Sequence, residues 1–302
     1  MFSPRTDLAL DAAALKNPIP GQKIDGVEVD SYNSEDVTVT KVTITNSRGE
    51  KTIGKRMGNY VTVECRNIRH GNPDSISHVS EVFKKELKSI VDKFRHNTIL
   101  VVGLGNRFIT PDSLGPKVSD GIEVTRHLGK NNVNLCTVSP GVLGITGIET
   151  LEIIEGIVRK INPDIIIAVD ALASGSMERI CTTIQIADTG ITPGAGVGNK
   201  RKELSQNTLG VPVIAVGVPT VVDAATVAND AMEHLLSALE GSVDVDDVLR
   251  DDSFRLALIK KSVNPYFGEL IVTPSEIDSV IDTVAGVISV GINDICNKRD
   301  CL

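Results

Sequence analysis

Hydrophobic and polar positions divide the chain into a part with a two-residue period and a part in which apolar runs alternate with helical patterns. Residues 25–68 contain "GVEVDSY", "VTVTKVTITN", "SRGEKTIGKRMGN" and "YVTVECRNI", in which Val, Thr and Ile recur at alternate positions between Gly and Asn turns. This pattern predicts antiparallel strands and hairpins. A turn-rich leader, residues 1–22, precedes them.

Short apolar runs rich in β-branched residues follow, namely "TILVVGLGN", "NLCTVSPG", "PDIIIAVDAL", "CTTIQIADTG" and "VPVIAVGVP". Apolar residues recur at helical spacing in residues 75–95, and helical patterns occupy 149–161 and 222–239. Buried strands that alternate with helices indicate an open sheet covered on both faces. We therefore expect an α/β fold with a mainly parallel open sheet flanked by helices and an antiparallel β-rich N-terminal portion.

The same patterns suggest how the chain is organised. We expect a single α/β domain over residues 8–302. Its parts would be a hairpin portion at 25–68, a core sheet at 98–240, an insertion at 241–270 and a closing amphipathic helix at 274–296.

Composition narrows the classes of partner. A net charge of −8, 3% aromatic residues and no Trp give no reason to expect nucleic-acid or anionic-membrane binding. The five cysteines are scattered without a CxxC pair, which favours a reducing compartment. The N-terminal residues lack the pattern of a signal peptide, and we find no run of about 20 apolar residues typical of a membrane span. These features predict a cytoplasmic protein.

Two acids follow buried strands at the edge where open α/β sheets bind ligands. Asp112 comes after "ILVVGLGN" by a short loop, and Asp170 ends the run "DIIIAVD". Asp112 has a second interpretation as the N-cap of a helix that begins near Leu114, and the spacing alone favours that cap. Asp170 must be paired, capped or functional, because an isolated buried carboxylate is costly. Asp223 enters a helical pattern and is interpreted as a first-turn acid.

The sequence lacks the motifs of nucleotide-binding, zinc-peptidase and serine-hydrolase sites. "GLGNRF" has Phe108 where a dinucleotide fingerprint has its third Gly, and no P-loop, H-E-x-x-H or G-x-S-x-G sequence occurs. The five histidines do not cluster near a strand end, whereas a zinc site usually takes several His or Cys ligands. Two aspartates without histidine suit a carboxylate pair that shares a proton and activates water. No cofactor is expected, and the metal requirement stays open.

A non-catalytic alternative rests on "GAGVGNKRK", residues 194–202. A small-ligand binder on a doubly wound sheet would use this glycine-rich loop to hold an anion or a nucleotide. The loop carries the densest cationic run of the chain, Lys200, Arg201 and Lys202, although a solvated basic turn has the same composition.

Several long blocks resemble the germination protease family of spore-forming bacteria. They are "VVGLGN", "TPDSLGP", "SPGVLGITGIET", "AVDALAS", "TTIQIADTGITPGAGVGNKRKELS" and "GVPVIAVGVPTVVDA". The likeness extends from "RTDLAL" to "VTPSEIDSVID", whereas residues 241–270 look shorter than in longer members. The resemblance implies an endopeptidase that degrades small acid-soluble spore proteins during germination, with a fold similar to the hydrogenase-maturation endopeptidases. It also implies a homotetramer made as an inactive zymogen.

The two essential aspartates of this family match Asp112 and Asp170. The family has been grouped with metalloendopeptidases, and the maturation enzymes use a histidine as a metal ligand. No histidine stands at a comparable strand end here, so we favour a metal-independent pair. One aspartate would act as general base toward water and the other would be protonated, with the two roles not assigned.

The resemblance also assigns roles outside the aspartate pair. Family substrates are cut beside acidic residues, so the run Lys200, Arg201 and Lys202 is the candidate substrate-binding site. The stretch "TDLALD", residues 6–11, is similar to the family's cleavage sites. We therefore predict self-cleavage of the Asp7–Leu8 bond, with residues 1–7 as a propeptide in which Arg5 is a candidate partner of a catalytic aspartate. Alternatively, Asp7 caps a helix over "LALDAAAL".

Overall fold

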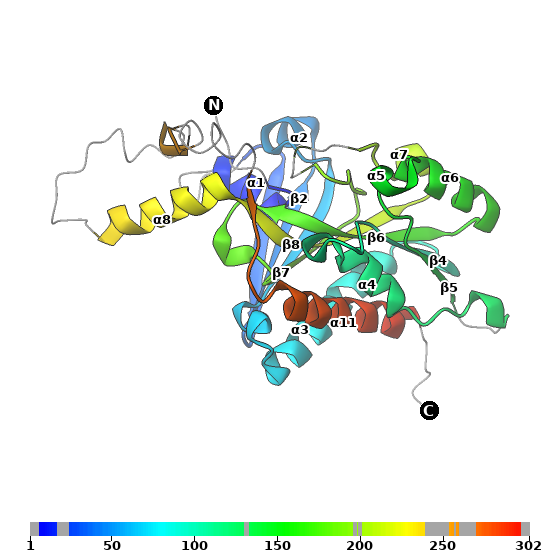
Figure 1. Ribbon diagram of the computed structural model, residues 1–302. Helices are drawn as coiled ribbons and strands as arrows, with labels where there is room; N and C mark the ends of the chain where they lie inside the picture. Colours follow the sequence, from blue (N-terminus) through cyan, green and yellow to red (C-terminus); the bar gives the residue numbers. More distant parts are fainter. Residues whose placement is uncertain are drawn as a thin grey trace.

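The structure, a computed structural model, describes most of the chain (Figure 1). The described residues are 6–16, 24–129, 133–195, 198, 201–238, 254–256, 258–259 and 270–296. Most of the expected insertion at 241–270 therefore lies outside them.

A mixed sheet forms the centre of the molecule (Figure 1). In the described part of the chain its strand order is β1-β2-β3-β7-β8-β6-β4-β5, and β9 pairs with β8. The strands are β1 (Val27–Ser34), β2 (Val37–Ile44), β3 (Gly58–Glu64), β4 (Thr98–Gly103), β5 (Asn134–Val138), β6 (Ile165–Ser174), β7 (Thr183–Ala187), β8 (Val213–Asp223) and β9 (Ile271–Val272).

The sheet has a parallel and an antiparallel part. Strands β5, β4, β6 and β8 run parallel to one another, while β1, β2, β3 and β7 pair in antiparallel fashion. The expected α/β fold is thus confirmed. Strand β7, expected among the apolar strands of the parallel core, instead pairs antiparallel with β8. Only residues 175–182 separate it from β6, which is too short for the crossover helix that a parallel connection needs.

One stretch of the predicted hairpin portion is helical. Residues Ser47–Ile53 form α2 between β2 and β3. The Asn46 side chain caps this helix by accepting from the N–H groups of Arg48 and Gly49, and Gly54 ends it with a φ of 74°. These two caps outweigh the weak two-residue period of "SRGEKTIGKRMGN", so the strand interpretation of that stretch is wrong.

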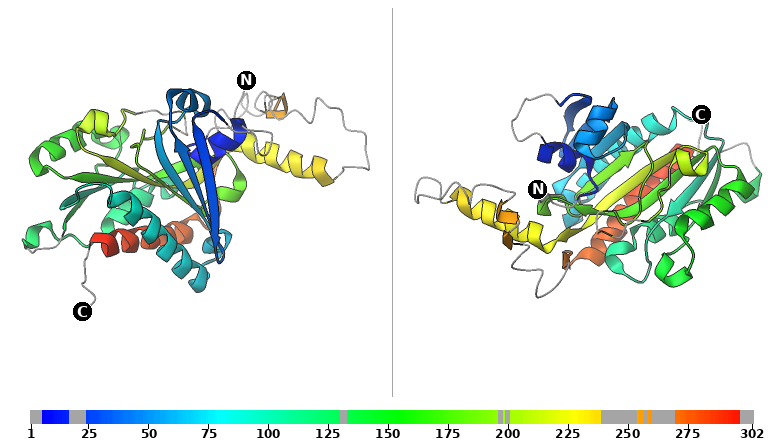
Figure 2. Two further views of the ribbon diagram at one scale, coloured as in Figure 1. Left: turned by 180° about the vertical axis from the view of Figure 1, so that it is seen from behind. Right: turned by 90° about the horizontal axis from the view of Figure 1, so that it is seen from above.

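Helices cover both faces of the sheet (Figures 1 and 2). One face carries α3 (Pro73–Val91), α4 (Leu114–Asp120) and α11 (Ile277–Cys296). The opposite face carries α1 (Ala9–Lys16), α2, α6 (Thr150–Ile161) and α7 (Gln206–Leu209). Helix α5 (Leu143–Thr146) precedes α6, and α8 (Ala224–Ala238) projects away from the sheet. The helices expected at 75–95, 149–161, 222–239 and 274–296 correspond to α3, α6, α8 and α11.

Apolar packing differs between the two faces. Under α3 and α11 the buried side chains form one cluster that extends from β2 to β5, with Phe83, Leu87 and Ile288 at its centre. On the other face they form two clusters. One lies under α6 over β4 and β6, and the other lies under α1 and α2 over β2 and β3. The candidate active site lies between these two clusters.

Helix α11 has the length and apolar composition of a membrane span, although we expected no such segment in the sequence. It is the one such helix among the described residues, and most of it is buried inside the protein. Val284, Ile288 and Ile292 belong to the large apolar cluster, and α11 packs along α3 and α4. A buried core helix passes the same test of length and composition, so this is weak evidence for a membrane segment.

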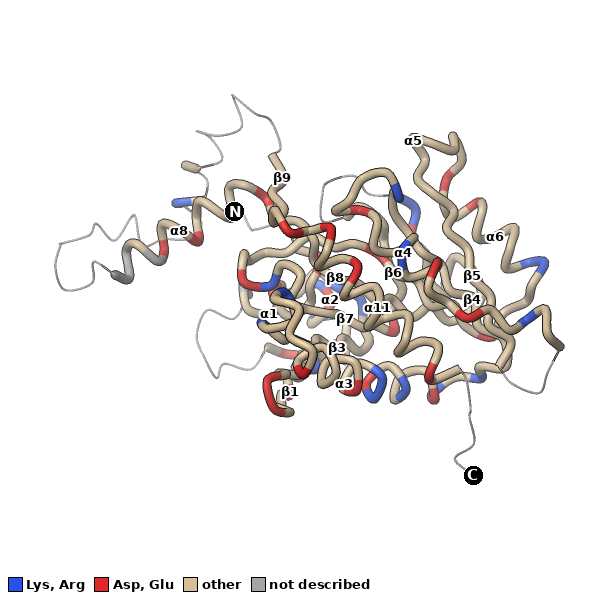
Figure 3. The backbone as a smooth tube through the Cα atoms, turned by 60° about the horizontal axis from the view of Figure 1, so that its bottom comes forward, with Lys and Arg blue, Asp and Glu red and all other residues tan. Residues whose placement is uncertain are grey.

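Charges of both signs lie along the outer helices (Figure 3). In α6, Arg159 pairs with Glu155, and at the end of α3, Lys88 pairs with Asp92. Such mixed charge is typical of a solvated helix face.

Candidate active site

Asp170 lies on β6 at the point where the neighbouring strand β4 ends. Gly103, the last residue of β4, is in register with Val169, and the Leu104 N–H donates to the Val169 carbonyl at 2.8 Å. Strand β6 continues to Ser174 beside β8. Asp170 therefore lies within its strand, and the expectation that it ends the strand is wrong. Its carboxylate is nevertheless at the open edge, since β4 has stopped beside it.

Three residues in register across β6, β8 and β7 form the floor of the site. Asp170 pairs with Gly217, and Gly217 pairs with Gln185, so the three residues share one face of the sheet. Gly217 has no side chain, and a Cβ there would collide with the Leu172 side chain. The open backbone at Gly217 separates the carboxylate of Asp170 from the amide of Gln185.

Asp112 approaches the same edge from the loop between β4 and α4. It ends the 3₁₀ helix η2 (Thr110–Asp112), and the Asn106 N–H donates to its carboxylate at 2.9 Å and to its carbonyl at 3.0 Å. Gly105 has a φ of 107°, and any Cβ there would collide with the Asp112 carbonyl oxygen. The Thr220 hydroxyl of β8 donates to the Pro111 carbonyl at 2.6 Å. These contacts fix η2 at the ends of the parallel strands.

The helix-cap interpretation of Asp112 is wrong. Ser113 is the N-cap residue of α4, and the Asp112 carboxylate accepts from Asn106, which precedes it in the loop. Asp223 does serve a helix start, because it ends β8 and its carboxylate accepts from the Ala225 N–H at the beginning of α8.

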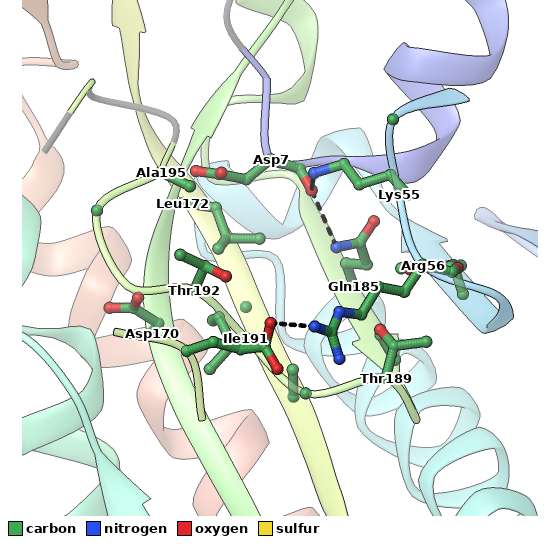
Figure 4. Close-up of a pocket in the computed structure, with 18 residues that line it drawn as sticks. Asp7, Lys55, Arg56, Asp170, Leu172, Gln185, Thr189, Ile191, Thr192 and Ala195 are labelled. Atoms are coloured by element: carbon green, nitrogen blue, oxygen red, sulfur yellow. Dashed lines mark hydrogen bonds and ion pairs between the residues drawn. The ribbon is translucent and has the colours of Figure 1, made fainter. Parts of the chain in front are cut away.

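Two adjoining clefts, of about 450 and 460 Å³, open over this part of the sheet. Asp7 and Asp170 line both of them. Lys55 and Gln185 line the first cleft, which Figure 4 shows, and Asp112 lines the second. The two acids that the sequence singled out thus face one connected site.

The surroundings of the two acids raise both of their pKa values. Burial raises the pKa of Asp170 well above its usual range, and the negative charges of Asp112 and then Asp7 raise it further. Burial also raises the pKa of Asp112 to about 6, against the opposing effect of the Asn106 N–H. Both carboxyl groups therefore hold a proton more tightly than an exposed aspartate does, and their titrations are coupled.

The N-terminal segment lies in the first cleft (Figure 4). The Asp7 N–H donates to the Ala173 carbonyl at 3.0 Å, and its carboxylate accepts from the Ala173 N–H at 2.9 Å. The Asp7 carbonyl accepts from Lys55 Nζ at 2.9 Å and from Gln185 Nε2 at 3.4 Å. Two donors on different elements thus point at the carbonyl of the bond that we predict to be cut.

Leu8 follows with a fully buried side chain. Its N–H donates to the Thr6 hydroxyl at 3.0 Å, and the Ala9 N–H at the start of α1 donates to Gln185 Oε1 at 2.7 Å. The first turn of α1 therefore contacts β7, and the Asp7 carboxylate contacts β6. The interpretation of Asp7 as the cap of that helix is wrong.

Sequence reasoning missed Lys55 and Gln185. Gln185 carried a detectable signal, because it is the one amide in the apolar run "TTIQIA" of β7. Lys55 carried none, since it is an ordinary polar residue of the loop between α2 and β3.

Two residues of the basic run, Arg201 and Lys202, lie in different surroundings. Arg201 lines the second cleft with Asp112 and Asp170. Lys202 points toward α6, where its N–H donates to Glu149 at 3.1 Å and its Nζ lies 3.4 Å from Glu152. Lys200 and Arg5 lie outside the described residues.

Carboxylates are the groups of this site that could ligate a metal ion. Within the described ranges, no three His, Cys, Asp or Glu side chains come together as a metal-ligand set.

Known proteins are similar to this chain over nearly its whole length. A family model described as "Germination protease" matches residues 7–248. The germination protease of Clostridium tetani is 47% identical over 97% of this chain and 95% of its own length. That of Clostridium acetobutylicum is also 47% identical, over 97% of this chain and 95% of its own length. The germination protease of Bacillus velezensis is 38% identical over 99% of this chain and 94% of its own length.

A solved structure is also among the similar proteins. It is a [NiFe] hydrogenase maturation protease, HycI, from Thermococcus kodakarensis KOD1, at 18% identity and a TM-score of 0.35. The match covers 68% of this chain and 98% of that one. At this similarity it carries no argument about the site.

Proposed function

The chain belongs to the germination protease family, and we propose that the cleft between Asp112 and Asp170 is its peptidase centre. Membership makes the protein a peptidase, a hydrolase of peptide bonds that acts in spore germination. The proposal concerns which residues carry the hydrolysis, which proteins are cut and how the enzyme is activated. The anion- or nucleotide-binding alternative is not favoured, because relatives over nearly the whole chain are proteases.

One observation carries the proposal. Two carboxyl groups whose pKa values are raised, Asp112 and Asp170, line one cleft, and the carbonyl of Asp7 lies in the adjoining cleft. A coupled pair of acids that shares a proton supplies a general base and a general acid in one place.

In the proposed reaction, Asp112 accepts a proton from water as the oxygen of that water attacks the carbonyl carbon. Lys55 and Gln185 hold the carbonyl oxygen as negative charge develops on it, which is the electrostatic role that lowers such barriers most. Asp170 delivers its proton to the leaving nitrogen as the C–N bond breaks. The proton on Asp112 then passes to Asp170, and the pair returns to its starting state.

The substrates we propose are small acid-soluble spore proteins. The Asp7–Leu8 bond of the chain itself would be the activating cut, which removes residues 1–7. Support comes from the position of this bond, whose carbonyl accepts from Lys55 and Gln185 in a cleft that Asp170 also lines. The homotetramer, the zymogen form and the cytoplasmic location in the spore stay predictions.

Peptide hydrolysis by purified variants tests the assignment of the pair. Asp112→Asn and Asp170→Asn are each expected to fold normally and to lose at least about 1,000-fold in kcat/KM on an acidic peptide. Robust cleavage by either variant would remove the pair from the mechanism. Treatment of wild type with a chelator tests the alternative that the enzyme is a metal-dependent peptidase. Loss of activity with chelator and its recovery with one divalent ion would establish that alternative.

A further inference from the structure

Asp11, a second acid of the N-terminal segment, is bound by residues other than those that bind Asp7. Asp11 is 4% exposed, yet its carboxylate makes three hydrogen bonds. Arg179 Nη1 donates at 2.6 Å, the Gly175 N–H at 2.8 Å and the Thr6 hydroxyl at 2.6 Å. Thr6 belongs to the same segment, whereas Gly175 and Arg179 belong to the stretch of chain between β6 and β7.

Gly175 and Arg179 are preorganised to bind an anion. Arg179 ends the 3₁₀ helix η4 (Met177–Arg179), and its Nε donates to Glu64 of β3 at 3.0 Å. Glu64 therefore holds the guanidinium in place while Nη1 points at Asp11. A backbone N–H beside a fixed guanidinium is a strong receptor for a carboxylate, because both hydrogen bonds are charge-assisted.

The two acids of the segment bind to successive parts of the chain at the end of β6 and just after it. The carboxylate of Asp7 is held by Ala173, and that of Asp11 by Gly175 and Arg179. Ala9, between them, is fully buried, which leaves room only for a small side chain. The segment thus presents an acid, a buried apolar residue, a buried small residue and a second acid to β6 and to the stretch of chain that follows it.

We propose that Arg179 and the Gly175 N–H form a specificity subsite for the carboxylate of an acidic substrate residue, the fourth residue after the cleaved bond. The proposal rests on the proposed function, because it counts from cleavage of Asp7–Leu8 in the position observed. In the uncut chain Asp11 fills the subsite. A protein substrate with the same spacing of acids takes its place.

This subsite differs from the basic run that the sequence suggested. Arg201 lines the cleft on the Asp112 side, and Lys202 pairs with acids of α6. The segment after Asp7 instead runs along β6 toward η4. A downstream acid of the substrate therefore meets Arg179 rather than the glycine-rich loop.

A purely structural ion pair is the competing account, in which Arg179 only docks α1 onto the body of the protein. The two accounts differ in one respect. A docking residue affects all substrates alike, whereas a subsite affects only the substrates that carry the acid it binds.

The test compares short peptides that contain "DLALD" with peptides in which the last Asp is Asn or Lys. Wild type and its Arg179→Met and Arg179→Glu variants, each expressed as the chain from Leu8 onward so that no propeptide blocks the site, are assayed for kcat/KM on each peptide. We expect wild type to prefer the Asp peptide over the Asn peptide by about 10- to 100-fold, the range for a hydrogen bond to a charged group. Arg179→Met should lose that preference, so that its kcat/KM values on the Asp and Asn peptides become about equal, and Arg179→Glu should favour the Lys peptide.

Arg66→Met is the matched control, because Arg66 pairs with Glu178 of η4 but its side chain is 81% exposed. It should keep the wild-type preference. An equal loss on the Asp and Asn peptides in Arg179→Met, or no preference in wild type, would refute the subsite while leaving the peptidase assignment intact. If wild type cleaves none of the peptides, or Asp170→Asn cleaves them as well as wild type does, the proposed function itself fails.

Discussion

On the face of the sheet that α3 and α11 cover, apolar side chains form one continuous cluster, whereas on the face of Asp170 they form two clusters with clefts between them. The strands that make both faces are the same. Ile167 and Val169 of β6 belong to the sealed face, while Ala168 and Asp170 point to the open one. Alternate residues of one strand thus serve packing and chemistry.

At the site, the open face lacks apolar packing that the sealed face has. Asp170, Gly217 and Gln185 occupy positions in register where apolar side chains would otherwise pack, and Asp170 is buried at a cost in free energy. The sealed face offsets that cost through the burial of apolar area. We therefore expect substitutions on the sealed face to change stability and substitutions on the open face to change catalysis.

The largest stability effect should come from the sealed face. Phe83 is fully buried, and Gly291 of α11 packs so closely against its ring that a Cβ there would collide with it. Phe83→Ala should lower the free energy of unfolding by about 3–5 kcal/mol, because it leaves a cavity between α3 and α11. Denaturant unfolding measures this loss. At a temperature where the variant is folded, its kcat should match that of wild type. A large loss of kcat would contradict the expectation that substitutions on the sealed face change stability and not catalysis.

Lys55 gives the matching test on the open face. Lys55→Met should lower kcat by about 100- to 1,000-fold while KM changes little, because the Lys55 contact strengthens as charge develops on the carbonyl oxygen. The stability of the variant should stay close to wild type. Steady-state kinetics together with thermal unfolding check both expectations. If KM rises and kcat is unchanged, Lys55 binds substrate without assisting the reaction.

A smaller effect concerns the pH dependence of stability. The pKa of Asp112 is raised to about 6 by burial, so the folded protein binds this proton more tightly than the unfolded chain does. The carboxyl costs no stability below about pH 4, and the cost grows as the pH rises to about 6, up to about 3 kcal/mol. Asp112→Asn removes the charge, so it should be more stable than wild type above pH ~6.

Urea unfolding of both proteins at several pH values measures this difference. The free energies of unfolding should coincide in acid and separate as the pH rises. A constant difference over the whole range would show that the pKa of Asp112 is not raised in the folded protein.

The parts of the site that could be predicted from the sequence are those with a local signal. Apolar runs predicted β4 and β6, and two acids, Asp112 after β4 and Asp170 in β6, were expected at one edge of the sheet. Helix α2 was missed because its caps, Asn46 and Gly54, decide its structure over the period of the residues between them.

The contacts of the N-terminal segment could not be predicted in this way. Arg179 meets Asp11 across 168 positions of sequence, and Gln185 meets Asp7 across 178. Neither pair shares a motif or a periodic pattern, because these contacts depend on how β6 and β7 bring distant residues together. The similarity of "TDLALD" to cleavage sites indicated the segment but not its partners.

The most direct test of the central claim is the fate of the Asp7–Leu8 bond in the intact chain. Wild type, Asp112→Asn and Asp170→Asn are incubated at several pH values, and intact mass and N-terminal sequencing follow the cut. The account predicts that wild type releases residues 1–7 and begins at Leu8, with a rate that rises through about pH 6 as Asp112 ionises. Both variants should stay uncut. A new N-terminus at another residue, or processing at the wild-type rate in both variants, would contradict it.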